Sequence, residues 1–326
     1  MELLRDPDRP KPQNYREWTY WRFGKGIAER LMIPFAERVW AIAPKHMNFS
    51  WIDHRVPPEP NFETVLRGAF QHEHDRSGFN HEFWYPIEGA IASLPKALAK
   101  GVKNIYLNHT VTKIDPKNKQ VSFDTGKVVG YQNLIYTLSL THLPHFSDDI
   151  PQHVMDAIKG LQFNQIKCVN IGINRPDISP YHWLYFHEAE EFIFHRISFP
   201  RSASAKTCPP GTSSVCYEIS SSKHRPLRVH VREALIQATI DGLVKAKIMR
   251  PEDEVLATDV LNIDPAYVIY DLDHEKNVKT IHDYLMSLDI HPRGRFGDWQ
   301  YYNMDHSILS GKRIADLIND RDTPAL

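Results

Sequence analysis

The sequence predicts an α/β (α+β) protein, and three patterns along the chain support this prediction. Apolar residues recur at helical spacing near the N-terminus. Short β-type runs joined by tight turns follow, and longer runs rich in β-branched and aromatic residues, typical of an antiparallel sheet, fill the middle of the chain. We expect four segments, which are 1–80 (helical), 81–148 (β-rich), 149–289 (a domain with an antiparallel sheet) and 290–326 (a closing strand and helix).

Composition argues against several classes of function. The 326 residues carry 39 basic and 40 acidic side chains, so neither a nucleic-acid footprint nor a polybasic membrane signal is expected. Three widely spaced cysteines, Cys168, Cys208 and Cys216, form no zinc-binding pattern, which favours a reduced, cytoplasmic protein. No apolar run approaches the length of about 20 residues that a membrane span needs. The charged N-terminus lacks the apolar core of a signal peptide.

The helical segment follows a Pro-rich, polar lead-in over residues 6–14. We expect two helices between Tyr15 and Trp40, because Gly24 and Gly26 interrupt the helical pattern. This glycine pair is not a dinucleotide loop, since no strand precedes it and the third glycine of GxGxxG is absent. The apolar residues at helical spacing are Trp18, Trp21, Ile27, Leu31, Phe35 and Val39.

A polar loop over residues 71–81 contains His72, His74 and His81. Histidine is a common metal ligand, but a metal site needs a helix or strand that presents its ligands in a fixed geometry. No such pattern surrounds these three residues. We therefore expect a solvated loop and predict no metal site.

The β-rich segment contains one predicted helix, over residues 90–100, with Ile91, Leu94 and Leu98 on one face. A turn at residues 124–126 separates two of the β-type runs. We expect a strand end at 83–86 and strands at 104–107, 111–114, 120–123 and 133–138, the last of them buried.

The antiparallel-sheet segment alternates helical and β-type patterns. Pro265 interrupts its last β-type run, because proline cannot donate a hydrogen bond to a neighbouring strand. We expect helices at 154–161, 227–248 and 278–288 and strands at 167–173, 183–187, 192–199, 214–219 and 254–269.

The stretch at residues 294–307 has an unusual composition. Gly294 and Gly297 bracket a predicted strand end, three aromatic residues follow, and a helix is expected over residues 308–319. Glycine lets the backbone approach a flat ligand closely, and a helix N-terminus favours a partly anionic ligand. An ordinary strand–turn–helix that closes a domain is the alternative interpretation.

Several segments, taken in order, resemble one family. These are FGKGIAER at 23–30, WIDHRV at 51–56, NHTVTKID at 108–115, and RGRFG and DHS between residues 293 and 307. They resemble FAD-dependent proteins of the UDP-galactopyranose mutase and amine oxidase/protoporphyrinogen oxidase superfamily. The resemblance covers most of residues 15–320 and is closest to the eukaryotic-type mutases.

The resemblance implies a Rossmann-like FAD/NAD(P)-binding domain, an antiparallel-sheet substrate domain and a helical segment. The FAD-binding domain is expected to be incomplete, because the family's GxGxxG unit is absent from this sequence. FAD is the implied cofactor, and its chemistry would be flavin-based, with no catalytic side chain identified. The implied cofactor-binding residues are Val111, Gly297, Asp298, Trp299, Asn303, Asp305 and Ser307. The implied substrate-binding residues are Arg196, Trp183, Tyr185, Tyr267 and Tyr301.

Three functions are compatible with this resemblance. The first is an FAD-dependent oxidoreductase of the amine oxidase/protoporphyrinogen oxidase type, N-terminally truncated or split. The second is a mutase-like isomerase acting on a nucleotide sugar, which Arg196 and the tyrosines favour. The third is a non-catalytic remnant. Glu88 favours the oxidoreductase, since the mutases carry a basic residue near this place.

The expected partners are a small-molecule substrate and a chain that supplies the dinucleotide-binding half. Without that half, the C-terminal helix lacks the parallel sheet on which it should pack. We therefore expect exposed apolar surface at Ile308, Ala315 and Ile318.

Overall fold

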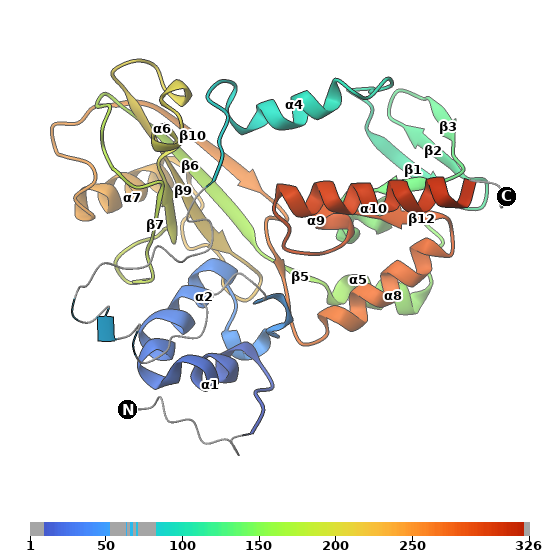
Figure 1. Cartoon of the computed structure of the whole chain (residues 1–326), viewed down its shortest axis with the longest axis horizontal. Helices are drawn as coiled ribbons and strands as arrows, with labels where there is room; N and C mark the ends of the chain where they lie inside the picture. Colours follow the sequence, from blue (N-terminus) through green and yellow to red (C-terminus); the bar gives the residue numbers. More distant parts are fainter. Residues whose placement is uncertain (1–9, 53–62, 64–65, 68–69, 71–82, 323–326) are drawn as a thin grey trace. The chain divides into compact units, whose positions relative to one another are not determined.

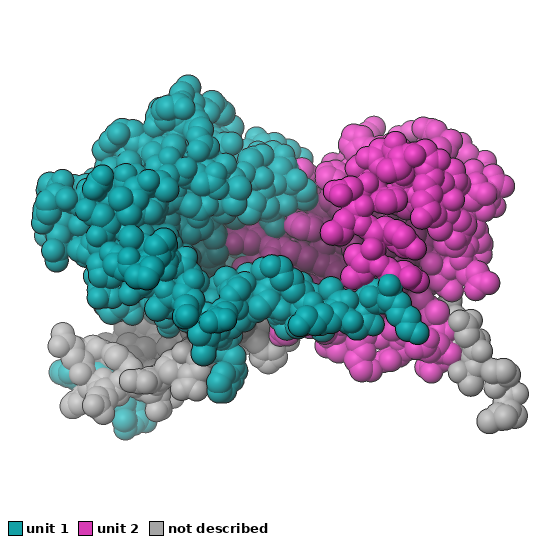
Figure 2. Space-filling view, turned by 90° about the horizontal axis from the view of Figure 1, so that it is seen from above, with its two compact units in different colours: residues 1–103, 164–266 teal, residues 104–163, 267–326 magenta. Residues whose placement is uncertain are grey.

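The computed structural model describes residues 10–52, 63, 66–67, 70 and 83–322. The chain divides into two compact units, which Figure 2 shows in teal and magenta. Unit 1 comprises residues 1–103 and 164–266, and unit 2 comprises residues 104–163 and 267–326. Each unit is therefore assembled from two stretches that are distant in the sequence. The four segments expected from the sequence describe the chain in linear order and stay a prediction.

Unit 1 begins with two helices joined by a π-helical turn. The side chain of Asn14 accepts a hydrogen bond from the backbone N–H of Glu17 and caps the first helix. Gly24 has φ 72° and ψ 172° and kinks this helix, which confirms the predicted interruption. The helices, shown in Figure 1, are α1 (Tyr15–Ile27), η1 (Ala28–Met32), α2 (Ile33–Trp40), α4 (Ser93–Ala99), α6 (Pro200–Ala203) and α7 (Arg232–Lys245), with 3₁₀ turns at Pro44–His46, Ser50–Ile52, Ala90–Ala92 and Ala205–Thr207.

The described strands of unit 1 form one large antiparallel sheet with the order β10-β6-β9-β8-β7. Its strands are β6 (Gln165–Ile173), β7 (Trp183–Tyr185), β8 (Arg196–Ser198), β9 (Ser213–Ser221) and β10 (Val255–Ile263). One face is apolar, because alternate residues such as Val169, Ile197 and Tyr217 are buried in a single cluster. Leu235 and Leu243 of α7 belong to the same cluster, so this helix covers that face. The sheet confirms the expected antiparallel architecture.

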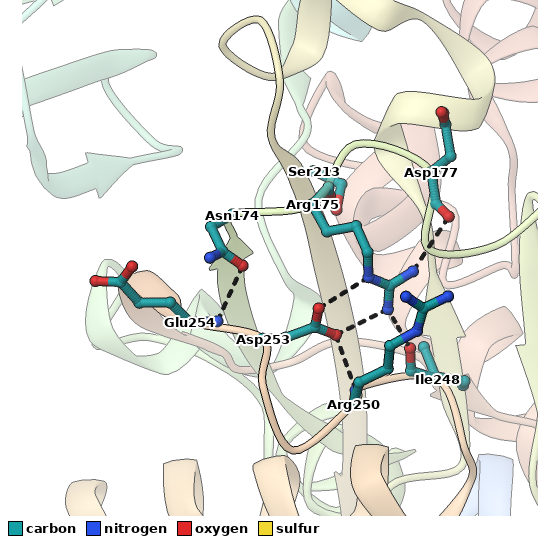
Figure 3. A network of polar contacts seen from close by, with 8 residues as sticks. All are labelled: Asn174, Arg175, Asp177, Ser213, Ile248, Arg250, Asp253 and Glu254. Carbon is teal, nitrogen blue, oxygen red and sulfur yellow. Dashed lines mark hydrogen bonds and ion pairs between the residues drawn. The ribbon is translucent and has the colours of Figure 1, made fainter.

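A charged clamp joins the ends of two strands of this sheet (Figure 3). Arg175, just after β6, donates two hydrogen bonds of 2.8 Å to the carboxylate of Asp253, just before β10. The same guanidinium donates to the carbonyl oxygen of Ile248 at 2.9 Å. The Asp253 side chain is only 4% exposed. Its hydrogen bonds with Arg175 are the main reason why the pKa of Asp253 falls to about 2.

Unit 2 combines small sheets with helices. In its described part, β1 (Val111–Asp115), β2 (Gln120–Phe123) and β3 (Val128–Gly130) form an antiparallel sheet, β4 (Leu134–Tyr136) pairs in parallel with β12 (Ile290–Pro292), and β5 (Gln162–Phe163) pairs with β11 (Val268–Ile269). The helices are α5 (Gln152–Gly160), α8 (His274–Met286), α9 (Gly294–Gly297) and α10 (Met304–Asp322), with a 3₁₀ segment at Leu140–His145. Helices α5 and α8 pack on each other.

The structure corrects some expected strands. Residues 83–86 and 104–107 have irregular backbone, and the expected strand at 133–138 contracts to β4. Tyr136 in β4 is buried but Ile135 is 45% exposed, so the prediction that this strand is buried holds for one face only. β-Type sequence forms a strand only beside a neighbour that pairs with it. β3, by contrast, was missed because its three residues are too few for a clear alternation.

Helical boundaries also differ from expectation: α8 begins at His274 rather than at residue 278, and α10 begins at Met304 rather than at residue 308. Helix α7 begins at Arg232 rather than near residue 227, because Val231 has an extended backbone and caps the helix. Between β12 and α10, residues Gly294–Gly297 form the short helix α9 rather than a strand end. The loop with His72, His74 and His81 lies outside the described residues. Within the described ranges, no group of three or more His, Cys, Asp or Glu side chains could hold a metal ion.

Candidate functional site

The residues between β12 and α10 form a tightly packed turn in unit 2. A Cβ atom on Gly297 would lie 2.5 Å from the carbonyl oxygen of Tyr136 in β4 and 3.2 Å from the carbonyl carbon of Pro292 in β12. No side chain fits at these distances, so residue 297 can lie this close to β4 and β12 only if it is glycine. Gly294 and Trp299 have φ angles of 76° and 52°, and the chain therefore turns sharply on both sides of Gly297.

Two histidines of α8 bind carbonyl groups of this turn. Nε2 of His282 lies 2.9 Å from the carbonyl oxygen of Gly297, and Nε2 of His274 lies 3.0 Å from that of Trp299. Burial lowers the pKa of both histidines. Each ring is therefore neutral near pH 7, and each carries the Nε2 proton that its hydrogen bond needs. Helix α8 thus fixes the position of the turn.

The carboxylate of Asp298 closes the same turn. It accepts a 3.0 Å hydrogen bond from the backbone N–H of Gly294 and another from the hydroxyl of Ser310 in α10. Nη1 of Arg293 lies 3.7 Å from its second oxygen. The Asp298 side chain is therefore engaged within the protein, and it ties the turn to α10.

The ring of Trp299 lies inside unit 2. The indole is fully buried and makes an edge contact with Phe163, with ring centroids 6.2 Å apart. Its Nε1 has no hydrogen-bond partner among the described residues. Helix α10 begins five residues later, where Asn303 and Asp305 are exposed and the Ser307 hydroxyl donates to the carbonyl oxygen of Asn303 at 3.1 Å. The carboxylate of Asp305 accepts hydrogen bonds from the backbone N–H groups of Asp305 and His306, so the first turn of this helix is partly capped by its own side chain.

The structure brings the predicted substrate residues Tyr267 and Tyr301 together. Their rings meet edge to face, with centroids 5.2 Å apart. The guanidinium of Arg295 lies 4.9 Å from the centroid of Tyr267 and 5.1 Å from that of Tyr301. The hydroxyl of Tyr270 accepts a 2.7 Å hydrogen bond from the backbone N–H of Tyr301. Arg295, Tyr267 and Tyr301 therefore form a cation–aromatic cluster, and Arg295 itself belongs to the turn.

The other three predicted substrate residues lie on the face of the large antiparallel sheet opposite its apolar core. Strand register pairs Arg196 with Tyr185 on one side and with Glu218 on the other, and it pairs Trp183 with Ser198. Alternation along the strands puts all of these side chains on one face. Arg196 donates to the carboxylate of Glu218, whose side chain is mostly buried. The positive charge of the Arg196 guanidinium is therefore neutralised by the carboxylate of Glu218.

Sequence reasoning missed several residues that build these features. His274 and His282 looked like ordinary members of an amphipathic helix, and only their burial shows their role. Arg295 was part of the family motif without an assigned contact. Glu218 had a signal, since a carboxylate inside an apolar β-type run usually needs a partner. Val111, the predicted adenine contact, lies in unit 2 on β1, a different sheet from β4 and β12.

Comparison with known proteins identifies the family. Residues 60–319 match the model of a family described as flavin containing amine oxidoreductase. The chain belongs to the flavin containing amine oxidoreductase family. None of the helices that the structure describes is long and apolar enough to cross a membrane.

Solved structures agree with this membership. The chain is similar to a reduced UDP-galactopyranose mutase, with 26% identity, a TM-score of 0.88, and coverage of 98% of this chain and 69% of the mutase. A protein assigned as a protoporphyrinogen oxidase from Exiguobacterium sp. shares the fold at 12% identity, with a TM-score of 0.69 and coverage of 98% and 70%. A Pyrococcus furiosus protein shares it at 11% identity, with a TM-score of 0.51 and coverage of 89% and 70%. The matches confirm the predicted fold class.

Membership of the flavin containing amine oxidoreductase family implies a flavin cofactor. The turn and the start of α10 fit such a group, because a rigid backbone with a left-handed Trp299 leads into the positive end of a helix dipole. This positive end suits the polar, electron-rich edge of a flavin ring. The groups that would bind it are mainly backbone atoms, and the side chains of Asp298, His274 and His282 support them.

Proposed function

We propose that this flavin containing amine oxidoreductase is an FAD-dependent oxidoreductase of the amine oxidase/protoporphyrinogen oxidase type. The flavin ring would bind at Gly297, Asp298, Trp299 and the start of α10. The observation that carries the proposal is the rigidity of this turn, which α8 fixes through two carbonyl groups. A site held in one conformation before its ligand arrives loses little entropy on binding.

When bound, FAD would supply a two-electron acceptor for a hydride from the substrate. The chain would contribute position and electrostatics. The positive end of the α10 dipole, with Asn303 and Ser307 beside it, would hold the polar edge of the ring. Tyr267 and Tyr301 would provide an aromatic wall, and Arg295 would add a positive charge that favours electron-rich groups. Val111 would contact the adenine end.

We further propose that the site is completed by a dinucleotide-binding segment, either on the same polypeptide or on a partner chain. Strands β4 and β12 form an isolated parallel pair among the described residues. Parallel strands are normally buried on both faces within a larger sheet. Ile135 of β4 and Ile308 of α10 are instead exposed. A neighbouring strand and helix would cover these groups and supply the missing hydrogen bonds.

Flavin retention by the purified protein tests the proposed function. We expect the wild-type chain to keep a visible flavin absorbance band after gel filtration, alone or after mixing with a dinucleotide-binding segment. Gly297→Ala should lose that band, because its Cβ would displace the turn. Gly311→Ala is the matched control, since a Cβ there meets nothing within 4 Å. If wild type retains no flavin under either condition, the non-catalytic remnant is supported instead.

A mutase-like isomerase acting on a nucleotide sugar is the second candidate. It is favoured by the high structural similarity to the UDP-galactopyranose mutase, with a TM-score of 0.88. Arg196, Tyr185 and Trp183 on one sheet face would contact the nucleotide part. The bond from Arg196 to Glu218 argues against it, because a phosphate would have to compete with an internal carboxylate. Conversion of UDP-galactopyranose by the reduced holoprotein, lost in Arg196→Lys, would favour the isomerase over the oxidoreductase.

A further inference from the structure

The large antiparallel sheet carries a pair of thiols that the proposed flavin chemistry does not use. Register pairs Cys168 of β6 with Glu218 of β9, and it pairs Asn170 of β6 with Cys216 of β9. The two cysteines are therefore diagonal neighbours on one face of two adjacent strands. Neither is in a disulfide.

The two thiols interact directly. The thiol of Cys216 donates a hydrogen bond to the sulfur of Cys168, and this bond lowers the pKa of Cys168 and raises that of Cys216. One sulfur thus gains thiolate character while its neighbour keeps its proton. A nucleophilic sulfur beside a second thiol that can resolve it is the arrangement found in reversible cysteine oxidation.

A small oxidant can reach this pair. Cys168 is 8% exposed and Cys216 is half-buried. Asp259 and Leu261, on the neighbouring strand β10, are exposed, so the sheet face is open within unit 1 beside the thiols. Burial and the carboxylate of Glu218 oppose the Cys168 thiolate and Arg196 favours it less strongly, so Cys216 is the main reason why the pKa of Cys168 falls.

We propose that Cys168 and Cys216 form a dithiol redox site, which a peroxide closes to an intramolecular disulfide. The Cys168 thiolate attacks one peroxide oxygen, the O–O bond breaks, and with one proton taken up the products are a sulfenic acid and water. The sulfur of Cys216 then attacks the sulfenic sulfur, and its proton leaves with the hydroxyl group as a second water. In total, two thiols and one hydrogen peroxide give one disulfide and two waters, so the thiols are oxidised and the peroxide is reduced.

The geometry predicts a disulfide that is easily reduced. Diagonal neighbours on paired strands have Cα atoms about 7–8 Å apart, whereas a relaxed disulfide needs about 4.4–6.8 Å. Bond formation must therefore draw β6 and β9 together, and the strain favours reduction by ordinary thiols. Glu218 lies directly opposite Cys168, so this movement would also disturb the ion pair between Glu218 and Arg196.

Thiol counting after treatment with one equivalent of hydrogen peroxide tests the proposal. We expect two of the three cysteines to become unreactive and reduced glutathione to restore them. Peptide mapping without reductant should link Cys168 to Cys216. Cys208→Ser is the matched control and should form the same link. Cys168→Ser should form none and should leave Cys216 titratable.

Three results would overturn the proposal. They are a link that involves Cys208, covalent dimers instead of an internal bond, and oxidation that stops at a sulfenic acid on Cys168. Peptide mapping of the wild-type protein distinguishes these results without any variant. The test therefore remains valid even if a variant fails to fold. None of these measurements needs bound flavin, and the result is therefore independent of the proposed function.

Discussion

Replacing Asp253 with asparagine tests how strongly the Arg175 clamp holds the large antiparallel sheet. Removal of one partner of a buried ion pair costs about 3–5 kcal/mol, because the other charge stays buried without compensation. Arg175 keeps 20% of its side chain exposed, so water can partly replace the carboxylate. We therefore expect Asp253→Asn to lower the free energy of unfolding by about 3 kcal/mol in urea titrations at pH 7.

The pH dependence gives a second estimate of the same interaction. The pKa of Asp253 falls from an ordinary 3.8 to about 2 in the folded protein. This difference corresponds to about 2 kcal/mol of stabilisation at neutral pH. Because the folded-state pKa is the lower one, the stabilisation is complete above the unfolded-state pKa and disappears as the pH falls through the folded-state value. The gap between wild type and Asp253→Asn should thus shrink by about 1 kcal/mol between pH 5 and pH 3.

An exposed ion pair provides the matched control. Nζ of Lys245 lies 3.1 Å from the carboxylate of Glu191, and both side chains are 52% exposed. Glu191→Gln should therefore cost less than about 1 kcal/mol. The reasoning fails if Asp253→Asn costs no more than Glu191→Gln, or if its effect is the same at pH 5 and pH 3.

Three other variants probe the core, the turn and the exposed helix. Gly242→Ala should destabilise the protein by about 1–3 kcal/mol in urea, because its Cβ would lie 2.6 Å from Cε1 of buried Phe194. Burial lowers the pKa of His274 and His282, so stability should be complete above about pH 6.5 and fall on acidification, and His274→Gln should flatten this dependence in thermal melts. Ile308→Lys should reduce self-association in light scattering without lowering Tm, since Ile308 is 46% exposed. Unchanged association would show that this surface is not the one that associates.

Local sequence patterns predicted most of the large antiparallel sheet, although the expected strand at 192–199 contracts to β8. The alternation of apolar and polar residues in β6 and β9 matches their two faces, because one face packs on α7 and the other does not. The break at Pro265 also matches, since β10 ends at Ile263 and β11 begins at Val268. These features depend on residues close in sequence, and the spacing of apolar residues along the chain is sufficient to predict them.

Features that depend on distant residues could not be predicted in this way. The hydrogen bond from His282 to Gly297 joins a helix to a turn 15 residues away, and the contact that requires Gly297 comes from Tyr136, far back in the chain. The ion pair between Arg196 and Glu218 depends on strand register, which the sequence alone leaves open. The family resemblance named Gly297 and Arg196, but it gave no physical reason for either.

In unit 2, the expected strands that did not form in full and helix α10 all leave apolar side chains exposed. Residues 104–107 are apolar and β-branched in part, yet Ile105 and Leu107 are exposed and the backbone is irregular. Ile135 lies on a strand whose described neighbour is β12 alone, and Ile308 lies on an exposed face of α10. A strand needs a partner for its backbone, and an apolar helix face needs a surface to bury it. One additional parallel strand with its helix would satisfy these requirements together, which is why we place the dinucleotide-binding segment at this edge of unit 2.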